Sequence, residues 1–179
     1  MRINLYCGPG GGKSTTAAWL FSELKRRHAS VELVTEYVKS WATMGKKVNE
    51  FDQIYLFGKQ MQYEFRFLSN GIKNIVTDSP LLLSSYYAHL YAPDLNIAEP
   101  LCKLAREYEK KYPSFNIFLD RKDKPYTQAG RYQTYEEAKQ LDAIMRHNLM
   151  REFEGTKQLV FFDYNDTESI LAAVLQNIT

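Results

Sequence analysis

The chain has 179 residues, with 23 Lys and Arg against 21 Asp and Glu, which gives a formal net charge of +2. A balance this close to neutral leaves no strong field that would commit the chain to nucleic acid or a membrane. Hydrophobic residues make up 45% of the chain, which is ordinary for a soluble globular protein. The length suffices for one compact domain and not for two, so we expect residues 1–179 to form a single domain.

Membrane, secreted and disulfide-rich classes are also disfavoured. The chain has no run of roughly 18 apolar residues, so we expect no transmembrane helix and no membrane partner. The N-terminal segment MRINLYCGPGG leads directly into glycines and lacks the apolar stretch of a signal peptide. Two cysteines, Cys7 and Cys102, are too few for a disulfide scaffold or a four-thiolate zinc site. We expect a cytoplasmic α/β protein.

Short apolar runs alternate with segments of helical periodicity along the chain. In chain order, the expected elements are a strand at 2–7, a helix at 13–28, a strand at 31–35, a helix at 51–69, a strand at 74–77, a helix starting near Pro80, a helix at 98–112, a strand at 115–119, a helix at 135–153, a strand at 158–162 and a helix at 166–177. Five short strands separated by helices predict a parallel sheet covered on both faces, a three-layer α/β sandwich. Ligands of such sheets bind at the carboxyl ends of the strands.

The strongest motif is the run GPGGGKST at residues 8–15, which lies between the first expected strand and the first expected helix. A P-loop has a glycine, four free positions and then Gly-Lys-Ser/Thr. Gly12, Lys13 and Ser14 match the end of this pattern, whereas Cys7 occupies the position of the first glycine. A strand before the motif and an amphipathic helix after it argue against an incidental glycine-rich turn. We therefore expect the chain to bind a nucleoside triphosphate.

The residues of this loop are expected to share the work of holding ATP and Mg²⁺. The glycines allow successive backbone N–H groups to turn toward a phosphate, and the following helix adds the positive end of its dipole. These glycines are Gly8, Gly10, Gly11 and Gly12. Lys13 is expected to contact the β- and γ-phosphates, and the Ser14 hydroxyl to ligate magnesium. Thr15 is placed to contact the α-phosphate.

The remaining motifs favour a kinase over other P-loop classes. The chain has no Asn/Thr-Lys-x-Asp motif, which a GTPase uses to read guanine. Its third strand ends in Asp78-Ser79-Pro80 and not in the Asp-Glu pair of many motor ATPases, so hydrolysis as the main activity is disfavoured. A kinase needs a carboxylate near the acceptor hydroxyl, a carboxylate near magnesium and a basic lid.

Two carboxylates are candidates for the first two roles. Glu36 follows the second expected strand and Asp78 the third, so both belong at the sheet edge that carries the loop. Glu36 is the candidate base for the acceptor's hydroxyl proton; an exposed helix-capping acid is the alternative. Asp78 would hold magnesium directly or through water, or serve as the base itself; the alternative is an N-cap for the helix near Pro80. The sequence leaves open which carboxylate is the base.

Residues 121–134 are the candidate lid. The segment combines positive charge, Pro and Gly with no apolar periodicity, which is typical of a loop that closes over an anion. Arg121 and Arg131 are the candidate clamps for the γ-phosphate, because a guanidinium group matches two phosphate oxygens at once. A solvated charged loop is the alternative.

Together these segments resemble the P-loop kinase/ATPase family that includes the ribosylnicotinamide kinase domain. The resemblance is carried by the glycine loop, VTEY around Glu36, FDQIYLFGKQ, TDSP and GRYQTYEEAKQLD. Many bacteriophage nucleotide-kinase-like proteins share this pattern, among them kinases of 5-hydroxymethyluracil in phage DNA. The resemblance implies a P-loop NTPase fold and an ATP- and magnesium-dependent transfer of a phosphoryl group to a hydroxyl. It also implies that Asp52 and Gln60 approach the acceptor and that Arg131 is the lid arginine.

Three hypotheses about the acceptor stay open. The first is a nucleoside or nucleotide, the second is a hydroxymethylated base within phage DNA in the host cytoplasm, and the third is a switch ATPase with no acceptor. The amide of Gln60 both donates and accepts hydrogen bonds, which suits a base edge. Basic clusters at 25–27, 46–47 and 110–111 supply charge for DNA phosphates, although solvated helix faces explain them equally well. The oligomeric state is also left open.

Overall fold

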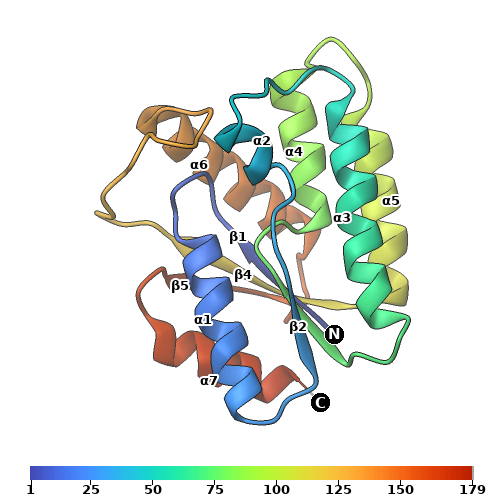
Figure 1. Cartoon of the computed structure of the whole chain (residues 1–179), viewed down its shortest axis with the longest axis vertical. Helices are drawn as coiled ribbons and strands as arrows, with labels where there is room; N and C mark the ends of the chain where they lie inside the picture. The colour runs from blue at the N-terminus through green and yellow to red at the C-terminus, as the bar shows by residue number, and fades with distance from the viewer. Residues whose placement is uncertain (179) are drawn as a thin grey trace.

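Five parallel strands form one sheet in a computed structural model that describes residues 1–178 (Figure 1). The strands are β1 (Arg2–Tyr6), β2 (Val31–Val34), β3 (Asn74–Thr77), β4 (Ser114–Asp120) and β5 (Leu159–Asp163). Their order across the sheet is β2-β3-β1-β4-β5, and every pairing is parallel. The expected all-parallel sheet is therefore confirmed, with β1 at its centre.

Helices cover both faces of the sheet and complete the three-layer sandwich (Figure 1). They are α1 (Lys13–Arg26), α2 (Lys39–Thr43), α3 (Asp52–Leu68), α4 (Leu81–Tyr91), α5 (Ala98–Lys111), α6 (Tyr135–Glu152) and α7 (Thr167–Asn177). Helices α1 and α7 pack on one face, and α3 to α6 pack on the other. Within residues 1–178, no helix combines the length and the apolar character needed to cross a membrane.

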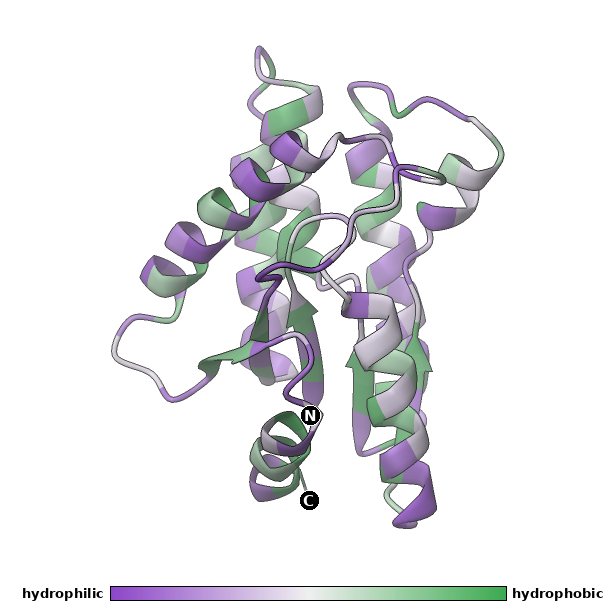
Figure 2. Cartoon of the chain, turned by 90° about the vertical axis from the view of Figure 1, so that its left-hand side faces the viewer, coloured by the Kyte–Doolittle hydropathy of each residue, from purple (hydrophilic) through white to green (hydrophobic). Residues whose placement is uncertain are grey.

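Side chains along the central strands point alternately to the two faces of the sheet, so the core consists of two apolar clusters, one on each face. Ile3 and Leu5 of β1 join Ile117 of β4 in the apolar cluster under α1 and α7. Tyr6 and Phe118 point to the other face and join the cluster under α4, α5 and α6. Figure 2 shows the consequence, with mainly hydrophobic strands between helices that carry hydrophilic residues on their outer sides. Both faces of the sheet are thus buried, as a parallel sheet requires.

Helix α2 is the one helix of residues 1–178 that the sequence pattern does not predict. It has five residues and no side-chain cap, so it has little intrinsic stability. Trp41 is buried and stacks on Tyr55 of α3 with ring centroids 5.9 Å apart, and Tyr37 packs edge-on against both rings. Tertiary contacts between aromatic side chains therefore hold α2, and local periodicity carries no sign of them.

A buried charge cluster fixes the amino-terminal end of the sheet. Arg2 is 2% exposed and Glu64 is fully buried, and the guanidinium Nη1 lies 3.2 Å from the Glu64 carboxylate. Arg2 also pairs with Glu109 and donates to the Tyr112 carbonyl at 2.7 Å. Burial raises the pKa of Glu64, and the Arg2 charge opposes that rise. The cluster joins β1 to α3 and α5, at the end of the sheet away from the glycine loop.

We predict that Glu64→Ala lowers the free energy of unfolding by about 3 kcal/mol, because it leaves the buried Arg2 guanidinium without one of its two carboxylates. Urea denaturation followed by circular dichroism measures the change. Glu107→Ala is the matched control, because the Glu107–Lys110 pair is exposed and surface pairs contribute little. Equal stability of the two variants would contradict the prediction.

Candidate active site

The glycine loop wraps the amino-terminal end of α1. Gly10 and Gly12 have φ angles of 74° and 110°, a left-handed conformation that favours glycine. Helix α1 begins at Lys13 and has no side-chain cap, so the N–H groups of its first turn are available to an anion. The Lys13 ammonium donates to the Cys7 carbonyl at 2.6 Å and lies across the loop. This geometry suits a phosphate group.

Cys7 stands where the P-loop pattern has its first glycine, and Gly11, four residues later, makes room for its side chain. The Cys7 side chain is fully buried, and a Cβ atom placed on Gly11 would lie 2.4 Å from its sulfur. Gly11 therefore provides the space that the first glycine of the usual pattern would have provided. Burial raises the pKa of the Cys7 thiol, so the group is a neutral packing element of the loop.

A carboxylate on α6 holds the loop from behind. Asp142 accepts a hydrogen bond from the Gly8 N–H and pairs with Arg121, whose Nη2 donates to the Pro9 carbonyl at 3.0 Å. Arg121 is buried and does not line the cavity beside the loop, contrary to the expectation that it clamps the γ-phosphate. Sequence reasoning missed Asp142, because nothing distinguishes one Asp within an amphipathic helix from a solvated one.

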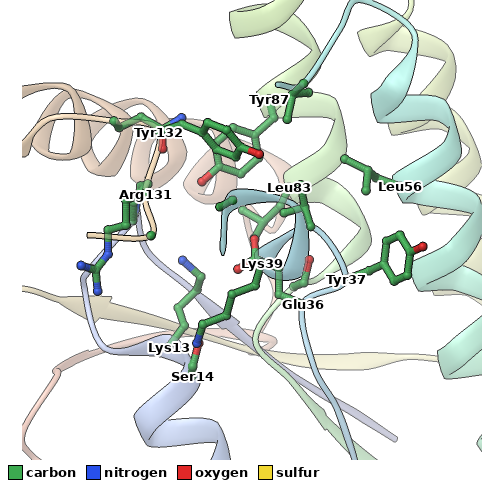
Figure 3. Close-up of a pocket in the computed structure, with 18 of the residues that line it drawn as sticks. Lys13, Ser14, Glu36, Tyr37, Lys39, Leu56, Leu83, Tyr87, Arg131 and Tyr132 are labelled. Carbon is green, nitrogen blue, oxygen red and sulfur yellow. The ribbon is translucent and has the colours of Figure 1, made fainter. Parts of the chain in front are cut away.

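A cavity of about 390 Å³ opens beside the loop (Figure 3). Its walls come from the loop, from the flap (residues 35–51, between β2 and α3), from α3 and α4, and from residues 124–133. The predicted site residues that line it are Gly10, Gly12, Lys13, Ser14, Thr15, Glu36, Gln60 and Arg131. The predicted residues outside the lining are Gly8, Gly11, Asp52, Asp78 and Arg121. Gly8 and Gly11 shape the loop from behind.

The two candidate carboxylates have different positions. Asp78 is 2% exposed and accepts a hydrogen bond from the Glu36 N–H at 2.8 Å, which ties the end of β3 to the end of β2. The Glu36 side chain reaches the cavity near Lys13 (Figure 3). Neither residue caps a helix, since the N-cap positions of α2 and α4 are Val38 and Pro80. The structure thus excludes the helix-cap alternative for both carboxylates.

Burial controls the protonation of Glu36. Removal from water raises the pKa of its carboxyl, the Lys13 ammonium lowers it, and the Asp78 charge raises it again. The net direction is upward, which makes the carboxylate a stronger proton acceptor than an exposed glutamate. Of the two carboxylates, only Glu36 lines the cavity, so only Glu36 can meet a hydroxyl group there.

Amide and aromatic side chains line the end of the cavity away from the loop. Gln60 is 3% exposed and donates to the Thr77 hydroxyl at 3.0 Å, while its Oε1 has no partner within residues 1–178. A buried acceptor without a donor is costly, and this oxygen lacks a partner that residues 1–178 could supply. Tyr87 and Tyr91 of α4 complete this end. The pocket suits a flat polar ring.

Gln53 also lines this pocket and is 4% exposed. Sequence reasoning singled out Asp52 instead. The Asp52 carboxylate accepts the Asn49 N–H at 2.7 Å at the start of α3 and does not reach the cavity, which corrects the expectation that it approaches the acceptor. A signal was present in the sequence, because Gln53 and Gln60 are seven residues apart and so share one helix face.

The candidate lid crosses the top of the cavity without forming a helix or strand between residues 121 and 134. The Tyr132 hydroxyl donates to the Lys46 carbonyl, which joins this segment to the flap. The Gln133 amide donates to the Tyr91 hydroxyl at 2.6 Å, which joins it to α4. The segment is therefore attached to both the flap and α4 above the cavity.

Two cations of this segment line the cavity. Arg131 donates to the Thr127 carbonyl, and its guanidinium lies 5.3 Å from the centre of the Tyr126 ring. The Lys124 ammonium lies 3.9 Å from the centre of the Tyr164 ring, which comes from the turn after β5. Both cations are thus held beside the loop by groups of the chain itself.

The donor set fits a magnesium ion held mainly by phosphates. Within residues 1–178, no group of three or more His, Cys, Asp or Glu residues could hold a metal ion. Mg²⁺ in phosphate-transfer sites keeps several waters and takes one or two protein oxygens in addition to substrate phosphates. The Ser14 hydroxyl lines the cavity in the first turn of α1, and Asp78 lies behind the wall beside Glu36. Ser14 suits direct contact, and Asp78 suits contact through water.

Comparison with known proteins agrees with this architecture. The profile of a family described as an AAA domain matches residues 2–156. No curated protein sequence matches the chain.

Two solved structures have a similar fold. A crystal structure of NadR protein in complex with NR has a TM-score of 0.73 and 16% sequence identity, and the match covers 99% of this chain and 51% of that one. A crystal structure of NadR protein in complex with NAD and AMP-PNP has a TM-score of 0.70 and 16% identity, with coverages of 98% and 48%. The chain thus spans about half the length of the NadR structures, and the likeness establishes the fold.

We predict that Gly11→Ala weakens MgATP binding about tenfold or more, because the added methyl group collides with the Cys7 sulfur and overpacking costs about 1–3 kcal/mol. Adding Cys7→Gly to the same chain removes the collision and restores most of the affinity. Isothermal titration calorimetry on the two single variants and the double variant measures this coupling.

Gly58→Ala is the control for this cycle. A Cβ atom on Gly58 meets nothing within 4 Å, so this variant retains full affinity. Strictly additive effects of Gly11→Ala and Cys7→Gly would show that the two residues do not share one space.

Proposed function

Since the chain belongs to the AAA domain family of P-loop proteins, we propose that it is an ATP- and Mg²⁺-dependent kinase acting on a nucleoside-type acceptor. The γ-phosphoryl group of ATP is transferred to a hydroxyl of that acceptor. The observation that carries the proposal is one cavity that the phosphate loop lines together with uncharged Gln and Tyr side chains of α3 and α4. Glu36 lines the same cavity near Lys13 (Figure 3). An ATPase that only hydrolyses ATP has no use for this uncharged part of the lining.

The loop end supports binding of the triphosphate. The first-turn N–H groups of α1 and the Lys13 ammonium face the β- and γ-phosphates and neutralise their charge. Ser14 holds Mg²⁺ directly, and Asp78 does so through water. A bound Mg²⁺ would supply charge neutralisation at the phosphate oxygens. Residues 121–134 act as the lid, and Arg131 contacts the transferring group while Arg121 supports the loop from behind.

Glu36 is the base in this proposal. Its carboxylate takes the proton of the acceptor hydroxyl, and the acceptor oxygen then attacks the γ-phosphorus in line with the departing ADP. The raised pKa of Glu36 supports this role, because a base works best when its pKa lies near the working pH. Asp78 positions Glu36 through the bond to its backbone N–H.

The distribution of charge favours a free nucleoside as the acceptor. The cations of the cavity belong to the loop, the flap and the lid, and the pocket beyond Glu36 is lined by uncharged side chains of α3 and α4. An acceptor phosphate would need a cation there, and a DNA strand would need an open basic track. The contact between Tyr132 and Lys46 instead closes the top of the cavity. The NR bound to the NadR protein is consistent with a small acceptor.

We predict that γ-labelled ATP with Mg²⁺ transfers its label to a free nucleoside, and that Lys13→Ala lowers turnover by orders of magnitude while the fold is retained. Separate incubations with nucleosides, nucleoside monophosphates, plain DNA and hydroxymethyluracil-containing DNA identify the acceptor. Label on the modified DNA alone would refute the nucleoside assignment. Free phosphate released at a rate that no acceptor changes would refute the kinase assignment and leave a switch ATPase.

The pH dependence of turnover tests the role of Glu36. We predict that kcat/KM falls as the pH falls through the raised pKa of Glu36, because protonation removes the base. This fall in kcat/KM on the acid side of the pH profile occurs at a higher pH than the pKa of an exposed glutamate would give. Glu36→Gln lowers kcat by about 10²-fold or more and abolishes this fall. The exposed Glu50→Gln keeps both rate and profile, and an unchanged profile in Glu36→Gln would exclude Glu36 as the base.

A further inference from the structure

Four cations line the cavity, and within residues 1–178 one of them has no hydrogen bond, ion pair or ring contact. They are Lys13, Lys39, Lys124 and Arg131. Each of the other three is held by a carbonyl or a ring of the protein. The Lys39 ammonium makes no hydrogen bond, ion pair or ring contact within residues 1–178, although its side chain reaches the cavity. A cation that donates no hydrogen bond to the protein, beside a phosphate loop, can donate to a ligand anion.

The position of Lys39 is determined by the packing of the flap. Lys39 is the first residue of α2, and α2 is pinned to α3 by the stack of Trp41 on Tyr55. Figure 3 shows its side chain extending from the flap toward Ser14, beside Lys13. Its charge acts on Glu36, three residues earlier in the chain. Lys39 thus lies close to both the expected base and the expected phosphate site.

We propose that Lys39 is a catalytic residue that contacts the γ-phosphoryl group during its transfer; this rests on the proposed kinase function. In the transfer, the acceptor oxygen forms a bond to the γ-phosphorus, and the acceptor proton goes to Glu36. The bond from the γ-phosphorus to the bridging oxygen breaks, and its electron pair leaves with ADP. Charge spreads over the three equatorial oxygens of the transferring group. Lys13 from the loop, Arg131 from the lid and Lys39 from the flap approach these oxygens from different elements.

The competing role for Lys39 is recognition of a charge on the acceptor. Its side chain extends toward Ser14, at the loop end of the cavity, and away from the uncharged Tyr87 and Leu56 (Figure 3). The geometry therefore favours the transferring phosphoryl group.

A binding experiment separates these roles without any acceptor. The affinities of wild type, Lys39→Ala and Lys39→Arg are measured for MgADP and for MgADP with aluminium fluoride, which imitates the transferring group. We expect Lys39→Ala to bind MgADP within about twofold of wild type and the fluoride complex at least about tenfold more weakly. Lys39→Arg recovers most of this loss. Lys47→Ala, an exposed lysine of the same flap that does not line the cavity, changes neither affinity.

Turnover supplies the second readout. With an acceptor identified, Lys39→Ala lowers kcat by about 10²-fold, as removal of one transition-state donor does, and leaves the KM for the acceptor unchanged. An equal loss of affinity for MgADP and for the fluoride complex would overturn the proposal, as would a rise in acceptor KM at constant kcat. If no acceptor is phosphorylated, the kinase assignment fails, yet the binding comparison still decides whether Lys39 contacts the γ-position.

Discussion

The Asp142 carboxylate is the point on which the geometry of the phosphate loop depends. One of its oxygens accepts the Gly8 N–H, the other pairs with Arg121, and Arg121 in turn donates to the Pro9 carbonyl. Arg121 is the first residue of the candidate lid and directly follows β4, whereas Asp142 lies in α6, the helix that follows the lid. The elements before and after the lid therefore both contact the phosphate loop.

The flap depends on a different kind of interaction. The stack of Trp41 on Tyr55 fixes α2 against α3, and the bond between Asp78 and the Glu36 N–H fixes the start of the flap against the sheet. These two anchors place a carboxylate and a lysine ammonium at the same cavity. The lid reaches the flap through Tyr132, so the two covers of the cavity meet above it. A single cavity results, lined by cations of the loop, flap and lid and by uncharged side chains of α3 and α4.

This division of the cavity matches the two tasks of the proposed kinase. Strong positive charge gathers where a triphosphate would lie, and neutral amides and aromatic rings gather where an acceptor would lie. The fold is shared with NadR protein over half the length of that protein, at 16% identity. Such a low identity leaves the acceptor to be decided by the residues of this pocket, of which Gln53 and Gln60 are the polar members of α3.

Sequence alone determined the elements whose signals are local. Apolar runs and helical periodicity predicted all five strands and six of the seven helices of residues 1–178, and motif spacing located the loop and Glu36 at one sheet edge. Only the tertiary structure decided what Arg121 and Asp142 contact. It also decided that α2 forms and that Gln53, not Asp52, faces the cavity. These features depend on contacts between residues that are far apart in the sequence. A local sequence pattern cannot predict such contacts, because the order of the strands in the sheet determines which side chains meet.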